Sequence, residues 1–103
     1  MENTVLEKFH QGRQSLGTFS AIGSPLAVES LRYTGLDYVI VDTEHSPAGI
    51  ESAAAQIAAA QGAGLTALAR ANEISRTAVL RLLDVGAQGV VVPCVETVEE
   101  VRE

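Results

Sequence analysis

Apolar residues fall into two patterns along the chain, short continuous runs and longer stripes of helical period. The short runs are rich in β-branched residues and stop at turn-forming residues, so they predict strands. These runs are 15–19, 38–41, 65–69 and 89–92. Between them the periodicity is helical, and most segments begin at a cap residue and end at glycine. They predict helices at 4–11, 24–34, 50–61 and 75–86, and a last helix from the capping box at Thr97 and Glu100.

The predicted order is one helix followed by strand–helix four times, with a strand about every 25 residues. Right-handed crossovers would make all four strands parallel. Residues 38–41 are all apolar or aromatic, so we expect both faces of this parallel strand to be buried. Two architectures use such a pattern, an open doubly wound sheet and a (β/α)8 barrel of about 250 residues. No G-x-G-x-x-G follows any strand, which disfavours a dinucleotide-binding sheet.

The length of the chain bounds its number of domains, and its charge bounds the class of partner that it can bind. Nothing in the 103 residues marks an internal boundary, so residues 1–103 are expected to be one partial domain, about 40% of such a barrel. The net charge of −6 argues against nucleic acid or an anionic membrane as partner.

No apolar stretch approaches the roughly 18 residues of a membrane span, and no signal-peptide run opens the chain. The single cysteine, Cys94, excludes an internal disulfide and fits a reducing, cytoplasmic location.

Chemically active side chains follow two of the predicted strands. Asp42, Glu44 and His45 come directly after the second strand, and Arg70 ends the third. In both architectures ligands bind beyond the carboxyl ends of the strands. A histidine can act as a general base near neutral pH, and a nearby carboxylate raises its pKa and orients its ring. Because Arg70 offers donors to a carboxylate or an oxyanion, the pattern predicts proton abstraction beside a small anionic substrate.

Each of these residues also has a structural interpretation. Asp42 could stabilise the turn after the strand, Glu44 could be a solvated loop residue, and His45 could be an ordinary loop histidine. Arg70 could form an ion pair with Glu44 or Glu73. Side chains 42 and 44 point the same way only if the strand continues through both of them. A metal held there by side chains alone is therefore disfavoured.

Asp84 falls in the last turn of the helix 75–86, where an acid opposes the helix dipole. Arg81, three residues earlier, could offset this. In a barrel this helix ends on the face opposite the chemically active strand ends, so Asp84 could act only in another subunit's site. The residues alone favour a structural role. The only lysine, Lys8, lies on the first helix, which argues against Schiff-base aldolase chemistry in this portion.

Four segments occur in the order GRQSLGTFSAIGSP, GLDYVIVDTEHSP, ALARAN and RLLDVGAQGVVVPCVET. Together they resemble the HpcH/HpaI aldolase/citrate lyase family, with the 4-hydroxy-2-oxoheptanedioate and 2-dehydro-3-deoxyglucarate aldolases nearest. The resemblance covers the chain from about residue 6 to residue 103. The D-x-E-H-x-P motif, the strand-end arginine and the L-L-D-x-G series are specific in combination, whereas each alone is weak.

The resemblance implies an α/β fold, with this chain forming the N-terminal helix and first four βα units of a (β/α)8 TIM barrel. It also implies a class II aldolase that cleaves a 4-hydroxy-2-oxo acid to pyruvate and an aldehyde, using Mg²⁺, Mn²⁺ or Co²⁺ as Lewis acid. His45 matches the base, with Asp42 supporting it and Glu44 behind it. Arg70 matches the residue that binds pyruvate and stabilises its enolate. Asp84 matches an acid donated from a neighbouring subunit, which implies a homo-oligomer, typically a hexamer.

One departure from the family concerns the metal. The family's ligands are a Glu and an Asp at the ends of strands five and six, beyond the last residue of this chain. No metal ligand is therefore assigned within it. We expect the 103-residue chain to be a fragment that is inactive alone. Two alternatives stay open: a non-catalytic half-barrel assembly module, and a related barrel lyase acting on a CoA ester or a phosphoenolpyruvate-like substrate.

Overall fold

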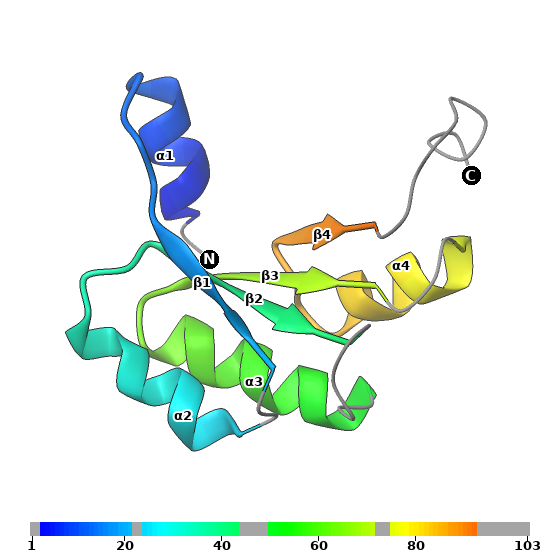
Figure 1. Ribbon diagram of the computed structural model, residues 1–103. Helices are drawn as coiled ribbons and strands as arrows, with labels where there is room; N and C mark the ends of the chain where they lie inside the picture. Colours follow the sequence, from blue (N-terminus) through cyan, green and yellow to red (C-terminus); the bar gives the residue numbers. More distant parts are fainter. Residues whose placement is uncertain (1–2, 22–23, 44–49, 72–74, 93–103) are drawn as a thin grey trace.

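The computed structural model describes residues 3–21, 24–43, 50–71 and 75–92. Its centre is a four-stranded parallel sheet in the order β1-β2-β3-β4, so spatial order follows chain order (Figure 1). The strands are β1 (Gly17–Ser20), β2 (Tyr38–Asp42), β3 (Thr66–Arg70) and β4 (Gly89–Val91). In a doubly wound sheet the strand order reverses at a switch point, so spatial order departs from chain order. In a (β/α)8 barrel each strand lies beside the next strand of the chain. The chain therefore has the α/β fold of part of a barrel.

The helices lie between the strands close to the predicted positions. They are α1 (Thr4–His10), α2 (Pro25–Ser30) with the 3₁₀ turn η1 (Leu31–Tyr33), α3 (Ile50–Gly62) and α4 (Arg76–Asp84). Among the boundary differences, the first strand begins at Gly17 and not at residue 15, and the helix predicted to reach residue 34 is α-helical only to Ser30 and continues as η1. The helix expected from Thr97 lies outside the described residues. No helix in the described part of the chain has the length and apolar character needed to cross a membrane.

Local side-chain chemistry explains where the helices begin and end. The side chains of Asn3, Ser24 and Ser75 each accept a hydrogen bond from the backbone amide three residues later. These bonds satisfy amides that the first helical turn leaves without a partner. Gly86 follows α4 with φ of +105°, a left-handed conformation that favours glycine after a helix. The caps explain why the sequence predicts these boundaries well.

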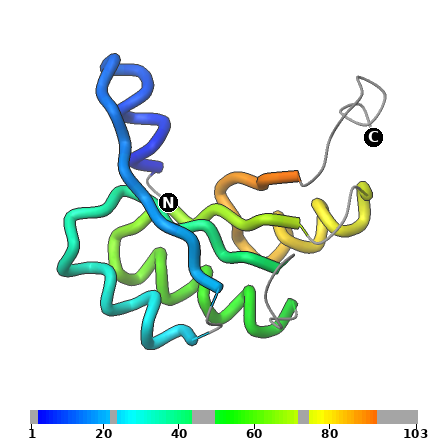
Figure 2. Tube along the Cα trace, viewed as in Figure 1, coloured from blue at the N-terminus to red at the C-terminus, as the bar shows by residue number. Residues whose placement is uncertain are grey.

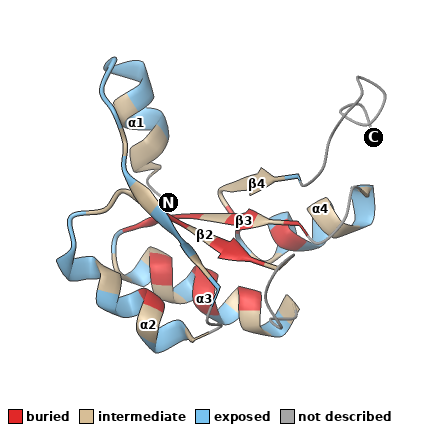
Figure 3. Cartoon of the chain, viewed as in Figure 1, coloured by how far each residue is buried: buried red, intermediate tan, exposed pale blue. Residues whose placement is uncertain are grey.

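The hydrophobic core lies between the sheet and the helices on one of its faces. Alternate residues of the two central strands, Val39, Val41, Ala67 and Ala69, are fully buried there. Figure 3 shows this buried layer on β2 and β3 and on the sides of α2 and α3 that face them. Small alanines on both the strands and α3 allow close approach of the helix to the sheet. The other members of the hydrophobic core are Val28, Ala53, Ile57, Ala60, Leu65, Ala71, Leu82 and Ala87.

The opposite face of the sheet, here called the open face, is only partly covered. It carries the other set of alternate residues, among them Phe19, Tyr38, Ile40 and Leu68. Tyr38 and Ile40 are of intermediate exposure, so the expectation that both faces of the second strand are buried is wrong for this structure. The reason is that α2 and α3 pack on the other face of the sheet.

Two predicted apolar stripes are also partly exposed. On α1, Leu6 is 51% and Phe9 74% exposed, and no residue of the helix is buried. On α4, Leu82 is buried as expected but Leu83 is 46% exposed. The helix α1 stands beyond the amino ends of the strands, apart from α2 and α3 (Figure 2). Its apolar side therefore meets no core in the described part of the chain.

Candidate active site

Asp42 and Arg70 are brought together at the carboxyl ends of two adjacent strands. They end β2 and β3 and are register partners, so their side chains emerge on the same face of the sheet. Nε of Arg70 donates to Oδ1 of Asp42 at 3.2 Å, and Nη2 donates to Oδ2 at 2.6 Å. This two-point geometry matches the planar guanidinium to the planar carboxylate and fixes their relative orientation. The result is a rigid charged pair at the edge where parallel sheets bind ligands.

The pair is largely shielded from water. The side chain of Asp42 is 3% exposed and that of Arg70 is 21% exposed. Buried charges are stable only when they are paired and hydrogen-bonded, which explains the two close contacts. Among the described residues Arg70 pairs with Asp42, and the ion pairs with Glu44 or Glu73 that the sequence offers stay predictions. Both of those glutamates lie outside the described residues.

Two further residues hold Arg70, and the sequence analysis assigned neither. The amide of Thr43 donates to the carbonyl of Arg70 at 3.2 Å, and the Thr43 hydroxyl also donates to that carbonyl. The ring of Phe19, on β1, lies 4.7 Å from Cζ of the Arg70 guanidinium. Both residues stand at the ends of predicted strands, since Thr43 follows Asp42 directly and Phe19 ends the first apolar run. Their positions in the sequence therefore indicated that they could lie near Arg70.

The structure does not bring all of the predicted site residues together. Glu44 and His45 lie outside the described residues, so their relation to Asp42 stays a prediction. Asp84 is the last residue of α4 and is exposed. The helix α4 starts after the carboxyl end of β3 and runs back towards the amino end of β4, so Asp84 lies at the opposite end of the sheet from Arg70.

The described residues do not fit a metal site. No group of three or more histidine, cysteine, aspartate or glutamate side chains in this part of the chain could hold a metal ion. Among the described residues Asp42 is the carboxylate at these strand ends, and both of its oxygens accept hydrogen bonds from Arg70. A cation at Asp42 would lie beside the positive guanidinium and be repelled by it. Asp42 is therefore better described as the anchor of Arg70.

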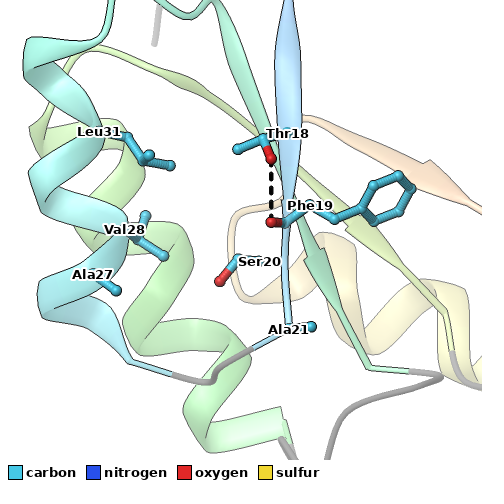
Figure 4. Close-up of a pocket in the computed structure, with 7 residues that line it drawn as sticks. All are labelled: Thr18, Phe19, Ser20, Ala21, Ala27, Val28 and Leu31. Atoms are coloured by element: carbon cyan, nitrogen blue, oxygen red, sulfur yellow. Dashed lines mark hydrogen bonds between the residues drawn. The ribbon is translucent and has the colours of Figure 1, made fainter.

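A pocket of about 180 Å³ lies beside the end of β1, on the other side of the strand from Arg70. Figure 4 shows Ser20 directed towards α2 and the Phe19 side chain directed away from it. The Ser20 hydroxyl contacts Oε1 of the fully buried Gln56 at 2.6 Å. The pocket belongs to the packing between β1 and α2, and the charged pair lies on the open face. The residues that line the pocket are Thr18, Phe19, Ser20, Ala21, Ala27, Val28 and Leu31.

Two curated relatives, both aldolases, match most of the chain. The hydroxypyruvate/pyruvate aldolase of Roseovarius nubinhibens is 32% identical over 101 residues, which cover 98% of this chain and 39% of the relative. The 5-keto-4-deoxy-D-glucarate aldolase of Escherichia coli is 32% identical over 88 residues, covering 85% and 34% respectively. The chain thus spans less than half the length of these relatives.

A solved structure and a family model agree with these relatives. The crystal structure of the citrate synthase SbnG superposes with a TM-score of 0.88 at 33% identity, over 92% of this chain and 39% of that one. The model of the HpcH/HpaI aldolase/citrate lyase family matches residues 15–103, which include all four strands and the Asp42–Arg70 pair. This chain therefore belongs to the HpcH/HpaI aldolase/citrate lyase family.

Proposed function

We propose that the chain contributes the first part of the active site of a class II pyruvate aldolase. Such an enzyme cleaves a 4-hydroxy-2-oxo acid reversibly to pyruvate and an aldehyde. The observation that carries the proposal is the Asp42–Arg70 pair, which holds a guanidinium at the carboxyl ends of parallel strands. Arginine in this position suits a small anionic substrate, and the matching relatives are named as aldolases.

The proposed reaction needs a base and a group that stabilises negative charge. His45 takes the proton of the 4-hydroxyl, the C3–C4 bond breaks, and the aldehyde leaves. The electron pair of that bond passes to the pyruvate enolate, whose oxygen Arg70 stabilises by hydrogen bonding. The enolate is then protonated at C3. Asp42 keeps Arg70 in place, and Glu44 is assigned a supporting role for the base.

The proposal includes components outside this chain. A divalent cation, Mg²⁺, Mn²⁺ or Co²⁺, would be held by ligands outside this chain and would supply Lewis acidity at the 2-oxo group. Asp84 is exposed and far from the Arg70 end of the sheet, which suits a role in a neighbouring subunit's site. We therefore propose a homo-oligomer, a hexamer as in the family, located in the cytoplasm.

The test is an assay of pyruvate release from 5-keto-4-deoxy-D-glucarate with Mn²⁺. Two proteins are compared, the 103-residue chain and a chimera in which this chain replaces the matched 39% of the Roseovarius aldolase. We expect turnover by the chimera and none by the chain alone. In the chimera, His45→Ala should lower kcat by about 10²- to 10⁴-fold, because a general base is lost.

The matched control is His10→Ala, which removes the exposed histidine of α1 and should leave turnover unchanged. The proposal is wrong if His45→Ala retains full activity or if Arg70→Ala does. Robust turnover by the 103-residue chain alone would contradict only the statement that the metal ligands lie outside it.

One observation favours a second candidate, a non-catalytic half-barrel module that assembles with another half. Within the described residues, β1 and β4 each pair with one neighbour, so each leaves one strand edge without a partner strand. Such edges favour pairing with another chain. Titration calorimetry of the chimera with pyruvate in the presence of Mn²⁺ separates the two candidates. Pyruvate binding that Arg70→Ala abolishes supports the aldolase, whereas a module supplies no substrate contact, so Arg70→Ala would leave binding unchanged.

A further inference from the structure

Phe19 and Arg70 come from strands that are not neighbours in the sheet. Phe19 is on β1 and Arg70 on β3, with β2 between them. Adjacent strands are about 4.8 Å apart, so the Arg70 side chain must extend across β2 to reach the ring. It does so over the open face, where Cζ lies 4.7 Å from the Phe19 ring centroid. This distance is within the range of a cation–π contact.

Within the described part of the chain, burial does not explain a phenylalanine at position 19. Its side chain points away from α2 (Figure 4), and the residue is 51% exposed, so the ring adds little to the core between the sheet and the helices. An ordinary apolar position would accept leucine equally well. What an aromatic ring adds is a negative face for the guanidinium.

We propose that Phe19 is a positioning residue that sets the orientation of the Arg70 guanidinium. The Asp42 carboxylate binds the guanidinium edge through Nε and Nη2. An edge contact alone leaves the guanidinium plane able to tilt out of the carboxylate plane. The Phe19 ring supports the guanidinium from another side, and Thr43 ties the Arg70 backbone to the end of β2. Together these contacts aim the donors of Arg70 at one place beyond the strand ends.

The inference deepens the proposed function, because it assigns a residue that prepares Arg70 for a small carboxylate such as pyruvate. It rests on the proposed function only for the identity of that anion. The contact between the ring and the guanidinium can be measured separately, in a protein with no turnover. The two claims therefore fail in different experiments.

The experiment is nuclear magnetic resonance of the arginine Nε–Hε groups in the 103-residue chain, with Arg70 assigned through Arg70→Lys. A proton held over an aromatic face resonates upfield because of the ring current. We expect an upfield Hε signal for Arg70 in the wild type and in Phe19→Tyr, which keeps the aromatic face. In Phe19→Leu, which keeps only apolar bulk, the signal should move downfield, because the ring current is lost while the hydrogen bond from Nε to Asp42 remains. Phe9→Leu, at an exposed phenylalanine of α1, is the matched control and should change nothing.

Titration calorimetry of the chimera with pyruvate in the presence of Mn²⁺ tests the functional part. Phe19→Leu should weaken the apparent affinity for pyruvate about two- to fivefold, the effect of losing one exposed cation–π contact, and Phe19→Tyr should restore it. An Arg70 signal that is unmoved by Phe19→Leu overturns the positioning role, as does a Phe19→Tyr variant that behaves like Phe19→Leu. If the wild-type chain shows the upfield signal but the chimera does not bind pyruvate, the positioning role stands and the proposed substrate is wrong.

Discussion

At the scale of single residues, the most consequential contact is between Asp42 and Arg70. Their two hydrogen bonds join groups that are 3% and 21% exposed. In such surroundings each charge depends on the other, because water reaches Asp42 hardly at all and Arg70 only in part. The Asp42–Arg70 pair therefore contributes both to the stability of the fold and to the proposed binding of an anion by Arg70. A substitution that breaks the pair should affect both.

Removing the charge of Asp42 should destabilise the fold measurably. Asp42→Asn keeps the shape of the side chain but removes the negative charge that faces the Arg70 guanidinium. We expect a loss of about 2 kcal/mol in the free energy of unfolding, less than for a fully buried pair because Arg70 keeps some contact with water. Urea unfolding followed by circular dichroism measures it.

Asp84→Asn provides the control for this substitution. Asp84 is exposed at the end of α4, so the same chemical change there should alter stability by no more than about 0.5 kcal/mol. Equal losses in the two variants would show that the Asp42–Arg70 pair contributes nothing specific to the fold.

At the scale of elements, α1 is attached to the sheet by polar contacts. Its first residue, Thr4, bonds through its amide and hydroxyl to the Thr66 hydroxyl, both at 2.9 Å, and its hydroxyl also donates to the Asp37 carbonyl at 3.0 Å. The Asp37 carboxylate pairs with Lys8 at 2.8 Å and accepts from the amide of Leu16 at 2.9 Å. Asp37 therefore connects α1 to the segments that begin β1 and β2.

This attachment should weaken in acid. The hydrogen bond from Lys8 and, next, the Leu16 amide hold the pKa of Asp37 below its ordinary value of 3.8. A carboxyl group with a lowered folded pKa stabilises the fold fully above its unfolded pKa, and the contribution is lost as pH falls through the folded pKa. We therefore expect the wild type to lose more stability below about pH 4 than Asp37→Asn does. Urea unfolding at a series of pH values tests this.

A suitable control is Glu7→Gln, which removes an exposed acid from the same helix. Its stability should fall with acid in parallel with that of the wild type. If Asp37→Asn and the wild type follow the same curve instead, the contact with Lys8 does not tie α1 to the sheet.

At the scale of the whole molecule, the described residues form one covered and one open side. The covered side has the core between the sheet and the helices, and the open face carries Phe19, Ile40 and Leu68 at partial exposure. In a complete barrel such a face points to a packed interior. The relatives are more than twice as long as this chain, which is consistent with further strands completing that interior in them.

The 103-residue chain on its own should associate through the open face and the strand edges. Sedimentation velocity over a concentration series should show a rising average mass. Leu68→Lys places a charge on the open face and should shift the chain towards monomer. Leu26→Lys, at a 75% exposed leucine of α2, is the matched control and should leave the association unchanged. A chain that stays monomeric throughout, or equal effects of the two lysines, would contradict this.

Most of the local structure follows from the sequence. The apolar runs mark the four strands, and Asn3, Ser24 and Ser75 mark helix starts, because caps and periodicity act between residues close in sequence. The same reasoning places Asp42 and Arg70 at strand ends. It overestimates burial at Phe9 and on the second strand, because which apolar side meets a partner depends on the packing of distant elements.

The sequence by itself determined the order of elements, the parallel sheet and the edge at which Asp42 and Arg70 lie. Only the tertiary structure decided that Arg70 pairs with Asp42, 28 residues away, and rests on Phe19. These contacts depend on strand register and on the direction of each side chain, and a shift of one residue would turn every side chain of a strand to its other face. Register is fixed by the packing of the whole sheet, so no local pattern in the sequence encodes the choice.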